Sequence, residues 1–544
     1  MRYFFTIFSV IVLWSGPFPN KFYLQSTDNI TDQYNSNNLP SNGIVEMKEM
    51  NDSTIFIATG GGLGKMIIQD TGNGIGKPRF QTIEVDSLEG AISAIDINDD
   101  YIAVSGYNYE YAIYTETYEF KGNGVAVSKD DGLTWHYIPQ SIDTNTNYLV
   151  IQEDTITTKS ITTNFQNITW DLAVLNDYLY VTNWSGGLRR FNIADDAIDA
   201  TWEVIPLPMD SQSELVFGDF DNYLIDPTLN LNQLGWSIDI IEDTLWVGTG
   251  NGINKGYINN DGNIEWVSHF NTSNGLPGNW VYKIDHSIVL QGSDNPIFRV
   301  WIITWATGGN EQCTISYTDD GGKTWVVSEN LPLYENQVED YVRIGKWIYD
   351  INFNDNNDIL LSTEIGLLQS YIDGIYWEKF HSPALSNNQL SFDILTSTIY
   401  TTYIDKFETL YLGTSDGLAV TSDQGASWET YRFWKSSSSD LGLESHFSCY
   451  PNPLYLGNAT FQGNNYARFV FNHNNHGNST IDIFDFSMDH VVHLDLINMI
   501  GSQGEIIWNG RDQLNRLVSN GVYFCRLKSG KDVQWTKLMV IHTK

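Results

Sequence analysis

The stretch "SKDDGLTW" (Ser128–Trp135) places two adjacent aspartates beside a glycine and a tryptophan. The same arrangement recurs as "TDDGGKTW" (Thr318–Trp325) and as "TSDQGASW" (Thr421–Trp428). An enzyme needs a pair of catalytic carboxylates once, whereas a turn that shapes a repeated structural unit can occur many times. The repetition therefore predicts a structural role for these aspartates rather than a catalytic one.

The residue types in these stretches suit a hairpin turn. An aspartate side chain can accept hydrogen bonds from the backbone amides of its own turn, and a following glycine supplies a positive φ. A hydroxyl group can complete the bonding, and the tryptophan would bury a large area between neighbouring sheets. The residues with these roles are Asp130, Gly132, Thr134, Trp135, Asp320, Gly322, Thr324, Trp325, Asp423, Gly425, Ser427 and Trp428.

Two degenerate copies of the pattern support the structural interpretation. The stretch "NNDGNIEW" (Asn259–Trp266) keeps the aspartate and the tryptophan but has Asn263 in place of the glycine. The stretch "SYIDGIYW" (Ser370–Trp377) keeps the glycine and the tryptophan but has Ile372 in place of the aspartate. A fold device can decay in this way, whereas a catalytic group cannot.

Around these turns a unit of about 45 to 65 residues recurs, which is the spacing of propeller blades. Alternating apolar and polar residues, separated by Gly, Asn and Asp, predict strands throughout. The second strands of the units begin at Ile55, Tyr101, Leu179, Leu245, Val300, Ile359 and Leu410. The sequence thus predicts an all-β protein with a seven-bladed β-propeller, in which the seventh blade has a fourth strand of its own and ring closure by strand exchange is not evident.

Composition and charge limit the fold class and the kinds of binding partner that are expected. The chain of 544 residues contains 14% aromatic residues and 45 glycines, which suits many short strands and turns. A formal charge of −37 disfavours a nucleic-acid partner, because phosphate binding requires clustered lysine and arginine. Residues 447–544 contain seven acidic and eight basic side chains, so the negative charge belongs to the preceding part.

This change of charge and the polar stretch "SSSSDLG" (Ser436–Gly442) predict a domain boundary. The expected parts are a signal peptide (1–16), an N-terminal extension (17–40), the propeller (41–435), a Ser-rich linker (436–446) and a C-terminal β-sandwich (447–544). The first part combines Arg2 with an apolar run and then small residues, a pattern typical of an export signal. Three cysteines are too few for a disulfide framework, so we expect buried thiols, although Cys449 and Cys525 could pair.

The pattern S/T-x-D-x-G-x-T/S-W resembles the Asp-box (BNR) repeat of sialidases, xyloglucanases and sortilin-type receptors. The resemblance implies a peripheral turn of a propeller, distant from the ligand face. A sialidase needs an arginine cluster, yet only Arg343 aligns with the start of an innermost strand. A xyloglucanase-like enzyme needs two carboxylates facing across a cleft, which that family generally forms from two propellers. We therefore expect no catalytic residues; the alternative is a glycan-active hydrolase or lyase with carboxylates at the channel mouth.

One feature predicts a binding surface. An aromatic residue aligns with the start of the innermost strand in five successive blades, and polar residues such as Asp171, Asp350 or Asp393 often follow it. The five aromatic residues are Trp170, Trp236, Trp280, Trp347 and Phe392. Because innermost strands line the central channel, these rings could form an acid-flanked mouth for a sugar or a peptide. Packing of the rings between blades is the simpler interpretation.

The sequence predicts neither a metal site nor a cofactor. The pairs in "HNNH" (His473 and His476) and "HVVH" (His490 and His493) look like ligands, but an odd spacing on a strand sends side chains to opposite faces. The stretch "NDNND" (Asn354–Asp358) offers oxygen ligands for calcium but lacks a ligand pattern of loop length. A polar hairpin turn explains it better.

The last hundred residues resemble the FlgD-type Ig-like module and the type A C-terminal sorting domain of the type IX secretion system. The matching residues are Pro451, Asn452, Pro453, Trp508, Asn509, Gly510, Asp512, Gly521, Val522, Tyr523, Phe524, Lys537, Leu538, Met539 and Val540. The resemblance implies export through outer-membrane secretion machinery, followed by release or surface attachment. A retained structural domain without a sorting role is the alternative, because Asn509 stands where that family usually has aspartate.

These features together predict a secreted or cell-surface bacterial protein. Its propeller would bind a polysaccharide or a protein without catalysis, and its C-terminal module would direct export. An assembly or sensor scaffold is a third possibility that the residues leave open.

Overall fold

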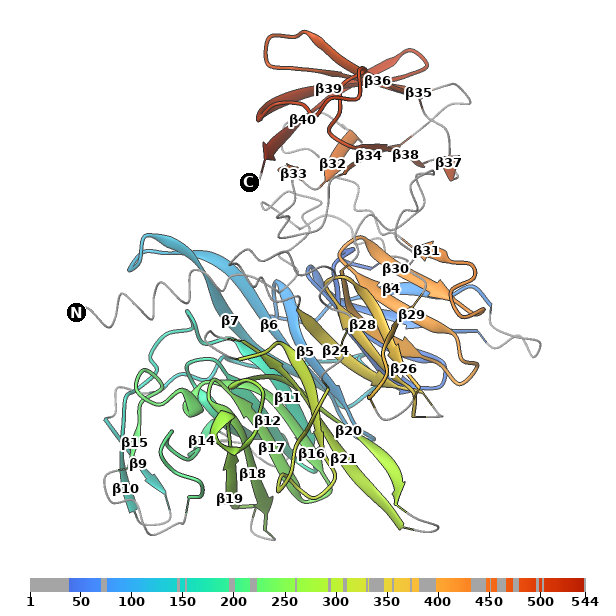
Figure 1. Cartoon of the computed structure of the whole chain (residues 1–544). Helices are drawn as coiled ribbons and strands as arrows, with labels where there is room; N and C mark the ends of the chain where they lie inside the picture. Colours follow the sequence, from blue (N-terminus) through green and yellow to red (C-terminus); the bar gives the residue numbers. More distant parts are fainter. Residues whose placement is uncertain are drawn as a thin grey trace.

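The computed structural model is an all-β chain (Figure 1). It describes residues 39–69, 76–143, 147–151, 154–194, 201–215, 223–259, 262–291, 295–306, 311–328, 331, 347–354, 357–371, 374–380, 398–431, 447–450, 452–456, 466–472, 479–495, 499–500 and 503–542. The expected signal peptide (1–16) and linker (436–446) lie outside these residues. Within them the helices are two 3-10 turns, η1 (Leu231–Gln233) and η2 (Thr272–Asn274), and no helix is long and apolar enough to cross a membrane.

Seven antiparallel sheets each contain four consecutive strands, as a propeller requires. The first four blades are β1–β4 (Ile44–Asn51, Thr54–Thr59, Gly62–Ile67, Arg79–Ile83), β5–β8 (Ala91–Ile97, Ile102–Ala112, Thr117–Ser128, His136–Ile138), β11–β14 (Thr169–Leu175, Tyr178–Asn183, Gly187–Asn192, Glu203–Ile205) and β16–β19 (Gly235–Ile241, Thr244–Thr249, Gly252–Ile258, Ile264–Phe270). The last three are β20–β23 (Trp280–Gln291, Asn295–Trp305, Thr314–Thr318, Val326–Val327), β24–β27 (Ile348–Phe353, Ile359–Thr363, Gly366–Ser370, Glu378–Lys379) and β28–β31 (Ile399–Ile404, Leu410–Thr414, Gly417–Thr421, Glu429–Tyr431). The predicted fold class is therefore confirmed.

A threonine and a glycine close the turn between the second and third strands of several blades. In blade 1 the hydroxyl of Thr59 donates to the carbonyl oxygen of Gly62 at 2.7 Å, and Gly62 has a φ of 136°. The same bond joins Thr363 to Gly366 and Thr414 to Gly417, at 2.6 and 2.7 Å. This local bond explains why the second strands of these three blades end in threonine and their third strands begin with glycine.

The repeated aspartate turns have the predicted geometry. Oδ1 of Asp320 accepts from the backbone amide of Thr324 at 2.9 Å, and Oδ2 accepts from its hydroxyl at 2.7 Å. These hydrogen bonds stabilise the ionised carboxylate and outweigh a small opposing effect of burial. They lower the pKa of Asp320 to about 2. The glycines two residues after each aspartate, Gly132, Gly322 and Gly425, have φ values of 80°, 94° and 85°.

The tryptophan of each turn packs against the neighbouring blade. Trp325 of blade 5 contacts Trp246 and Phe270 of blade 4 with ring centroids 6.4 and 6.0 Å apart. Trp428 of blade 7 contacts Phe380 of blade 6 at 6.3 Å. The stretch Ser128–Trp135 is thus a self-bonded turn that carries an inter-blade tryptophan, Trp135, packed with Phe56 of blade 1.

The ring closes by packing of blade 7 against blade 1. All four strands of blade 7 come from one continuous segment, so no strand is exchanged. Ile44 of blade 1 shares a buried cluster with Tyr403 and Tyr411 of blade 7, and the Tyr403 hydroxyl donates to Glu49 at 3.1 Å. Closure therefore depends on side chains that are far apart in the sequence.

A small three-stranded sheet lies outside the blades. It joins β9 (Tyr148–Ile151) and β10 (Asp154–Thr158), which precede blade 3, to β15 (Leu224–Ile225), which follows it. Strands β10 and β15 run parallel.

Residues after the propeller form a β-sandwich of two sheets around one core. One sheet has the order β32, β34, β38, β37 (Phe447–Tyr450, Ala467–Asn472, Gln503–Trp508, Met499–Ile500), and the other has the order β33, β40, β39, β35, β36 (Leu454–Leu456, Asp532–His542, Gly521–Ser529, Ser479–Phe484, His490–Asp495). All three cysteines of the chain, Cys313, Cys449 and Cys525, are buried free thiols. Burial raises the pKa of Cys449 to about 12, so this thiol is unreactive at neutral pH.

Two stretches considered for metals have different outcomes. The described residues of "NDNND" bond as expected for a polar turn: Oδ1 of Asn354 accepts from the amide of Asp358 at 2.8 Å, and its carbonyl oxygen accepts from the amide of Asn357 at 2.9 Å. The prediction for "HVVH" is wrong, because a bulge in β36 places His490 and His493 on the same face of the sheet. The pair in "HNNH" lies outside the described residues.

Candidate functional site at the channel mouth

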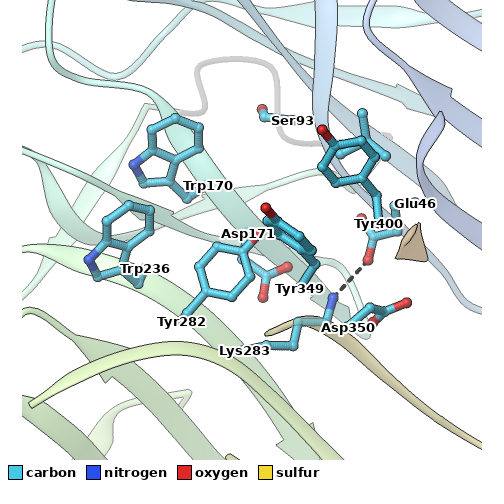
Figure 2. Close-up of a pocket in the computed structure, with 11 residues that line it drawn as sticks. Glu46, Ser93, Trp170, Asp171, Trp236, Tyr282, Lys283, Tyr349, Asp350 and Tyr400 are labelled. Carbon is cyan, nitrogen blue, oxygen red and sulfur yellow. Dashed lines mark hydrogen bonds and ion pairs between the residues drawn. The ribbon is translucent and has the colours of Figure 1, made fainter. Parts of the chain in front are cut away.

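The innermost strand of every blade has a register shift at its second or third residue. The residue at the shift is Val45, Ser93, Trp170, Trp236, Tyr282, Tyr349 or Tyr400, in blade order. Such bulges re-aim side chains. All seven residues line one cavity on the axis of the ring, and five of them are aromatic (Figure 2).

Behind this aromatic layer lies a charged one. Glu46, Asp171, Lys283 and Asp350 each follow a bulge residue and line the same cavity. Nζ of Lys283 lies 2.9 Å from Oε1 of Glu46, and this ion pair joins blade 5 to blade 1 across the channel (Figure 2). The cavity is small, at about 40 Å³, which suffices for a few water molecules but not for a sugar ring. A larger ligand must therefore bind at the outer mouth.

Burial controls the ionisation of the channel carboxyls. It raises the pKa of Asp171 to about 7 and that of Asp350 to about 6, because a buried carboxylate loses hydration. Burial would also raise the pKa of Glu46, but the Lys283 ammonium outweighs it and the pKa is lowered. The channel therefore holds an ionised pair beside carboxyls that are partly protonated near neutral pH.

Several of these carboxylates bond to the next blade. Glu46 accepts from the amide of Ile95 at 3.2 Å, and Asp171 accepts from the amide of Ile238 at 3.1 Å. Asp96, deeper in the channel, accepts from the amide of Val174 at 2.8 Å. An innermost strand is a sheet edge with unpaired amides, and a carboxylate from the preceding blade satisfies one of them. These acids therefore connect adjacent blades.

The predicted aromatic residues divide between the mouth and the interior. Trp170 and Trp236 line the cavity, with ring centroids 5.4 Å apart in a stacked arrangement. Trp280 and Trp347 do not line the cavity: Trp280 packs on Trp184 at 5.1 Å, and Trp347 packs on Trp305 at 4.5 Å. The prediction of a binding surface therefore fits Trp170 and Trp236, and the prediction of interior packing fits Trp280 and Trp347.

In the last three blades the residues that line the cavity differ from the predicted ones, although Trp280 begins β20 and Trp347 directly precedes β24. The cavity positions of blades 5, 6 and 7 belong to Tyr282, Tyr349 and Tyr400. Strand β28 begins at Ile399, so Phe392 is not at its start, and Phe392 itself lies outside the described residues. An aromatic residue followed by a polar one, as in "WDLAV", "WSIDI", "YKIDH", "YDINF" and "YTTYI", is the signal that would have found them.

Aromatic rings also continue from the mouth onto an exposed hairpin. Strands β6 and β7 are longer than other strands of their blade, and their hairpin extends outward near the upper left of Figure 1. Successive ring pairs run from Tyr111 to Tyr118, Tyr109, Phe120 and Trp170, with centroids 5.5, 5.7, 5.1 and 6.1 Å apart. We call the rings of Tyr111, Tyr118, Tyr109, Phe120, Trp170 and Trp236 the aromatic track.

The outer part of the aromatic track is open to solvent. Tyr109, Tyr111 and Tyr118 are 44%, 51% and 60% exposed. Tyrosine has a ring that can stack on a ligand and a hydroxyl that can remain hydrated, so it is enriched in binding surfaces. Sequence reasoning missed these residues because nothing local distinguishes them from other tyrosines of a long hairpin.

A second concave surface lies at the outer rim of blades 2 to 4, beside the small sheet. It encloses about 1000 Å³ and is lined by residues that include His136, Arg190, Phe191 and Trp202. Two of its polar groups are already engaged: Nε of Arg190 lies 2.6 Å from Oε2 of Glu203, and the Trp202 indole donates to the carbonyl oxygen of Pro139. This groove is a useful reference surface for tests of the mouth.

Comparisons with known proteins give only remote similarities. No family model matches the chain, and no curated protein matches it. Among solved structures, PorZ of Porphyromonas gingivalis, a bacterial surface component of the type-IX secretion system, is 13% identical with a TM-score of 0.23, and the match covers 92% of this chain and 86% of PorZ. An ancestral GH74 enzyme is 11% identical with a TM-score of 0.45, over 93% of this chain and 63% of the enzyme. BamB from Moraxella catarrhalis is 10% identical with a TM-score of 0.32, over 73% and 99% of the two chains.

Proposed function

We propose that this chain is a secreted or cell-surface binding protein whose propeller recognises a polysaccharide along the aromatic track, without catalysing a reaction. The observation that carries the proposal is the unbroken series of rings from the exposed Tyr111 to Trp170 and Trp236 at the mouth. A row of ring faces suits an extended ligand with repeating apolar faces better than a compact one.

Charge favours a neutral polysaccharide over an anionic one. The chain has a formal charge of −37, and the carboxyls of the channel outnumber the two lysines, Lys48 and Lys283, that face them. A sulfated or uronic-acid polymer would therefore be repelled from the mouth. A neutral glycan, which binds through stacking and hydroxyl hydrogen bonds, meets no such barrier.

The role of the channel carboxylates supports a binding function. Glu46 is paired with Lys283, and both Glu46 and Asp171 accept hydrogen bonds from the next blade. A catalytic carboxylate must instead reach the substrate, and the cavity of about 40 Å³ does not admit a sugar ring. These contacts are those of groups that hold the ring of blades together.

One observation favours an enzyme as the second candidate. Asp171 and Asp350 both line the cavity, and burial raises their pKa values to about 7 and about 6, the range in which a carboxyl can act as a general acid. A glycan-active hydrolase with these two acids would need the mouth to open on binding.

Polysaccharide arrays probed with the full chain, with product release measured in the same wells, distinguish the candidates. We expect binding to neutral glycans without products, and a loss of at least about tenfold in affinity for Tyr109→Ala combined with Tyr118→Ala. Trp202→Ala in the rim groove is the matched control and should bind normally. Products released by the parent chain but not by Asp171→Asn would show that the protein is a hydrolase. Binding to proteins but to no glycan would show that the ligand is a protein.

The C-terminal sandwich has a separate proposed role as an export signal read by outer-membrane secretion machinery. This role follows from the resemblance of residues 447–544 to type A sorting domains. Expression in a bacterium with a type IX system should place the full chain outside the cell, and deletion of residues 447–544 should retain it in the periplasm. Equal export of both chains would leave the sandwich a structural domain only.

A further inference from the structure

Three potential metal ligands meet on the outer sheet of the C-terminal sandwich. Nδ1 of His493 lies 2.6 Å from Oδ1 of Asp482, and Nε2 of His490 lies 3.3 Å from the same oxygen. The two nitrogens and the carboxylate oxygen all lie within 4.8 Å of one another. They come from adjacent strands, since Asp482 is in β35 and both histidines are in β36.

A bulge in β36 makes this meeting possible. His493 pairs directly with Asp482, and Ile483 pairs with Val492, but Phe484 pairs with His490. The extra residue at this point, Val491, changes the alternation of side chains, so that two histidines three residues apart share a face. Without the bulge, their odd spacing would have separated them.

The separations suit a small dication. Zn²⁺ binds imidazole nitrogen and carboxylate oxygen at about 2.0–2.2 Å in tetrahedral geometry, which places neighbouring ligand atoms about 3.3 Å apart. The 3.3 Å contact of His490 already has this separation, and the 2.6 Å contact of His493 needs to lengthen by less than 1 Å. The histidine side chains are 39% and 46% exposed, so a metal can enter and solvent can supply a fourth ligand.

The neighbours of the three groups hold them in place. Nε2 of His493, on the far side of its ring, lies 3.3 Å from Oδ1 of Asp495. Nη2 of Arg526 donates to Oδ2 of Asp482 at 2.7 Å and leaves Oδ1 directed at the histidines. Metal-binding histidines and carboxylates commonly have such outer partners, which fix the tautomer and the orientation of the ligand.

A second group of potential ligands is a weaker candidate. Asp239, Asp285 and His286 lie within the same distance of one another, deeper in the propeller channel. Their environment includes Lys48, which faces Asp285 and His286 and would repel a dication. The two histidines of the sandwich site are also exposed, whereas the three residues of this group are half-buried.

We propose that Asp482, His490 and His493 form a binding site for one divalent transition-metal ion of the zinc type. Imidazole with a single carboxylate is a donor set that suits Zn²⁺ and its neighbours and excludes calcium and magnesium, which require oxygen ligands. The bound ion would join the edge strand β36 to β35. It would thereby stabilise the open edge of the sheet.

Titration of the tag-free, chelator-treated full chain with ZnCl₂, followed by isothermal calorimetry, tests the proposal. We expect one Zn²⁺ per chain, and Co²⁺ in the same site should give the visible absorption of tetrahedral coordination. His490→Ala and His493→Ala should each weaken Zn²⁺ binding by at least about tenfold. Asp495→Asn, which alters the hydrogen-bond partner of His493, should weaken it by about tenfold. The exposed His136→Ala in blade 2 is the matched control and should bind like the parent chain.

Each other outcome contradicts the site. Absence of binding to the parent chain would leave the cluster a set of histidine–aspartate ion pairs. Equal binding by the parent chain and both histidine variants would place the metal elsewhere, and sensitivity to one histidine alone would rule out the three-ligand arrangement. Thermal unfolding of each variant in chelator, compared with the parent, shows that the fold is intact.

Discussion

Nη2 of Arg468, in strand β34 of the sandwich, lies 3.1 Å from Oδ2 of Asp416, in the turn between β29 and β30 of blade 7. The side chains are 0% and 3% exposed, so the pair is buried where the two domains meet. Charges removed from water in this way need a partner, because their lost hydration must be replaced. The sandwich is therefore docked on the propeller through a specific contact.

Removal of one partner of this pair should destabilise the docked arrangement. Asp416→Ala leaves the Arg468 guanidinium without this buried carboxylate, which costs about 3–5 kcal/mol. The exposed pair of Lys406 and Asp52, with side chains 44% and 69% exposed, is the control, and Asp52→Ala should change stability by about 0–1 kcal/mol. Thermal unfolding and limited proteolysis at the domain junction measure both effects, and similar curves for the two variants would contradict a docking role for Arg468.

The aspartate turns should contribute stability that depends on pH. The pKa of Asp320 in the folded chain is about 2, below its ordinary value, so its contribution is present above about pH 4 and is lost as the pH falls towards 2. Asp320→Ala should reduce the free energy of unfolding at pH 7 by about 1 kcal/mol, the value of a surface turn bond. The neighbouring Asp319→Ala removes a different contact, that with Arg299, and serves as a comparison. The difference in the free energy of unfolding between the parent and Asp320→Ala should shrink as the pH falls from 7 to 2.5. A constant difference would show that hydrogen bonds to the carboxylate are not its cause.

The contribution of the channel carboxyl of Asp171 to stability should have the opposite pH dependence. Burial raises the pKa of Asp171 to about 7, so the folded chain holds this proton more tightly than the unfolded chain. The contribution of Asp171 to the free energy of unfolding is largest below about pH 4 and falls as the pH rises from 4 to 7. Asp171→Asn cannot ionise, so its stability relative to the parent should increase between pH 5 and pH 8, as measured by chemical denaturation. A relative stability that stays flat over this range would mean that Asp171 is ionised throughout.

Ring closure should be sensitive to volume at one glycine. A Cβ atom on Gly413 of blade 7 would lie 2.6 Å from Cγ2 of Ile44 in blade 1 and 2.6 Å from Cγ2 of Thr401. Gly413→Ala should therefore destabilise the propeller by about 1–3 kcal/mol through overpacking. In a double-mutant cycle Ile44→Ala should relieve part of this cost, so the two changes should couple favourably. Strict additivity would show that the two blades do not press on each other at this point.

The turns and the strand order could be predicted because they depend on neighbouring residues. Asp320 bonds to Thr324, and Thr59 bonds to Gly62, each within a few positions of the chain. A period that repeats seven times then leaves few folds other than a propeller. A local pattern also predicted the polar turn at Asn354, whereas the expectation of buried free thiols came from the small number of cysteines.

Positions within the channel could not be read with the same accuracy. Trp280 and Tyr282 both lie near the start of β20, and only the bulge decides that Tyr282 faces the axis while Trp280 packs inside. A shift of one residue exchanges the two faces of a strand, so a small alignment error moves a side chain from the site to the core.

Residue patterns alone were thus sufficient to predict the all-β class, the seven units and the turns that connect their strands. Short-range hydrogen bonds and the alternation of side chains along a strand depend only on residues close together in the sequence. The contacts that bear on function required the folded chain. The Glu46–Lys283 pair joins residues more than two hundred positions apart, and the aromatic track crosses three blades. The histidine pair of β36 depends on a bulge in the pairing of this strand with β35. Register and ring closure arise from long-range packing between strands, which residues close together in the sequence do not specify.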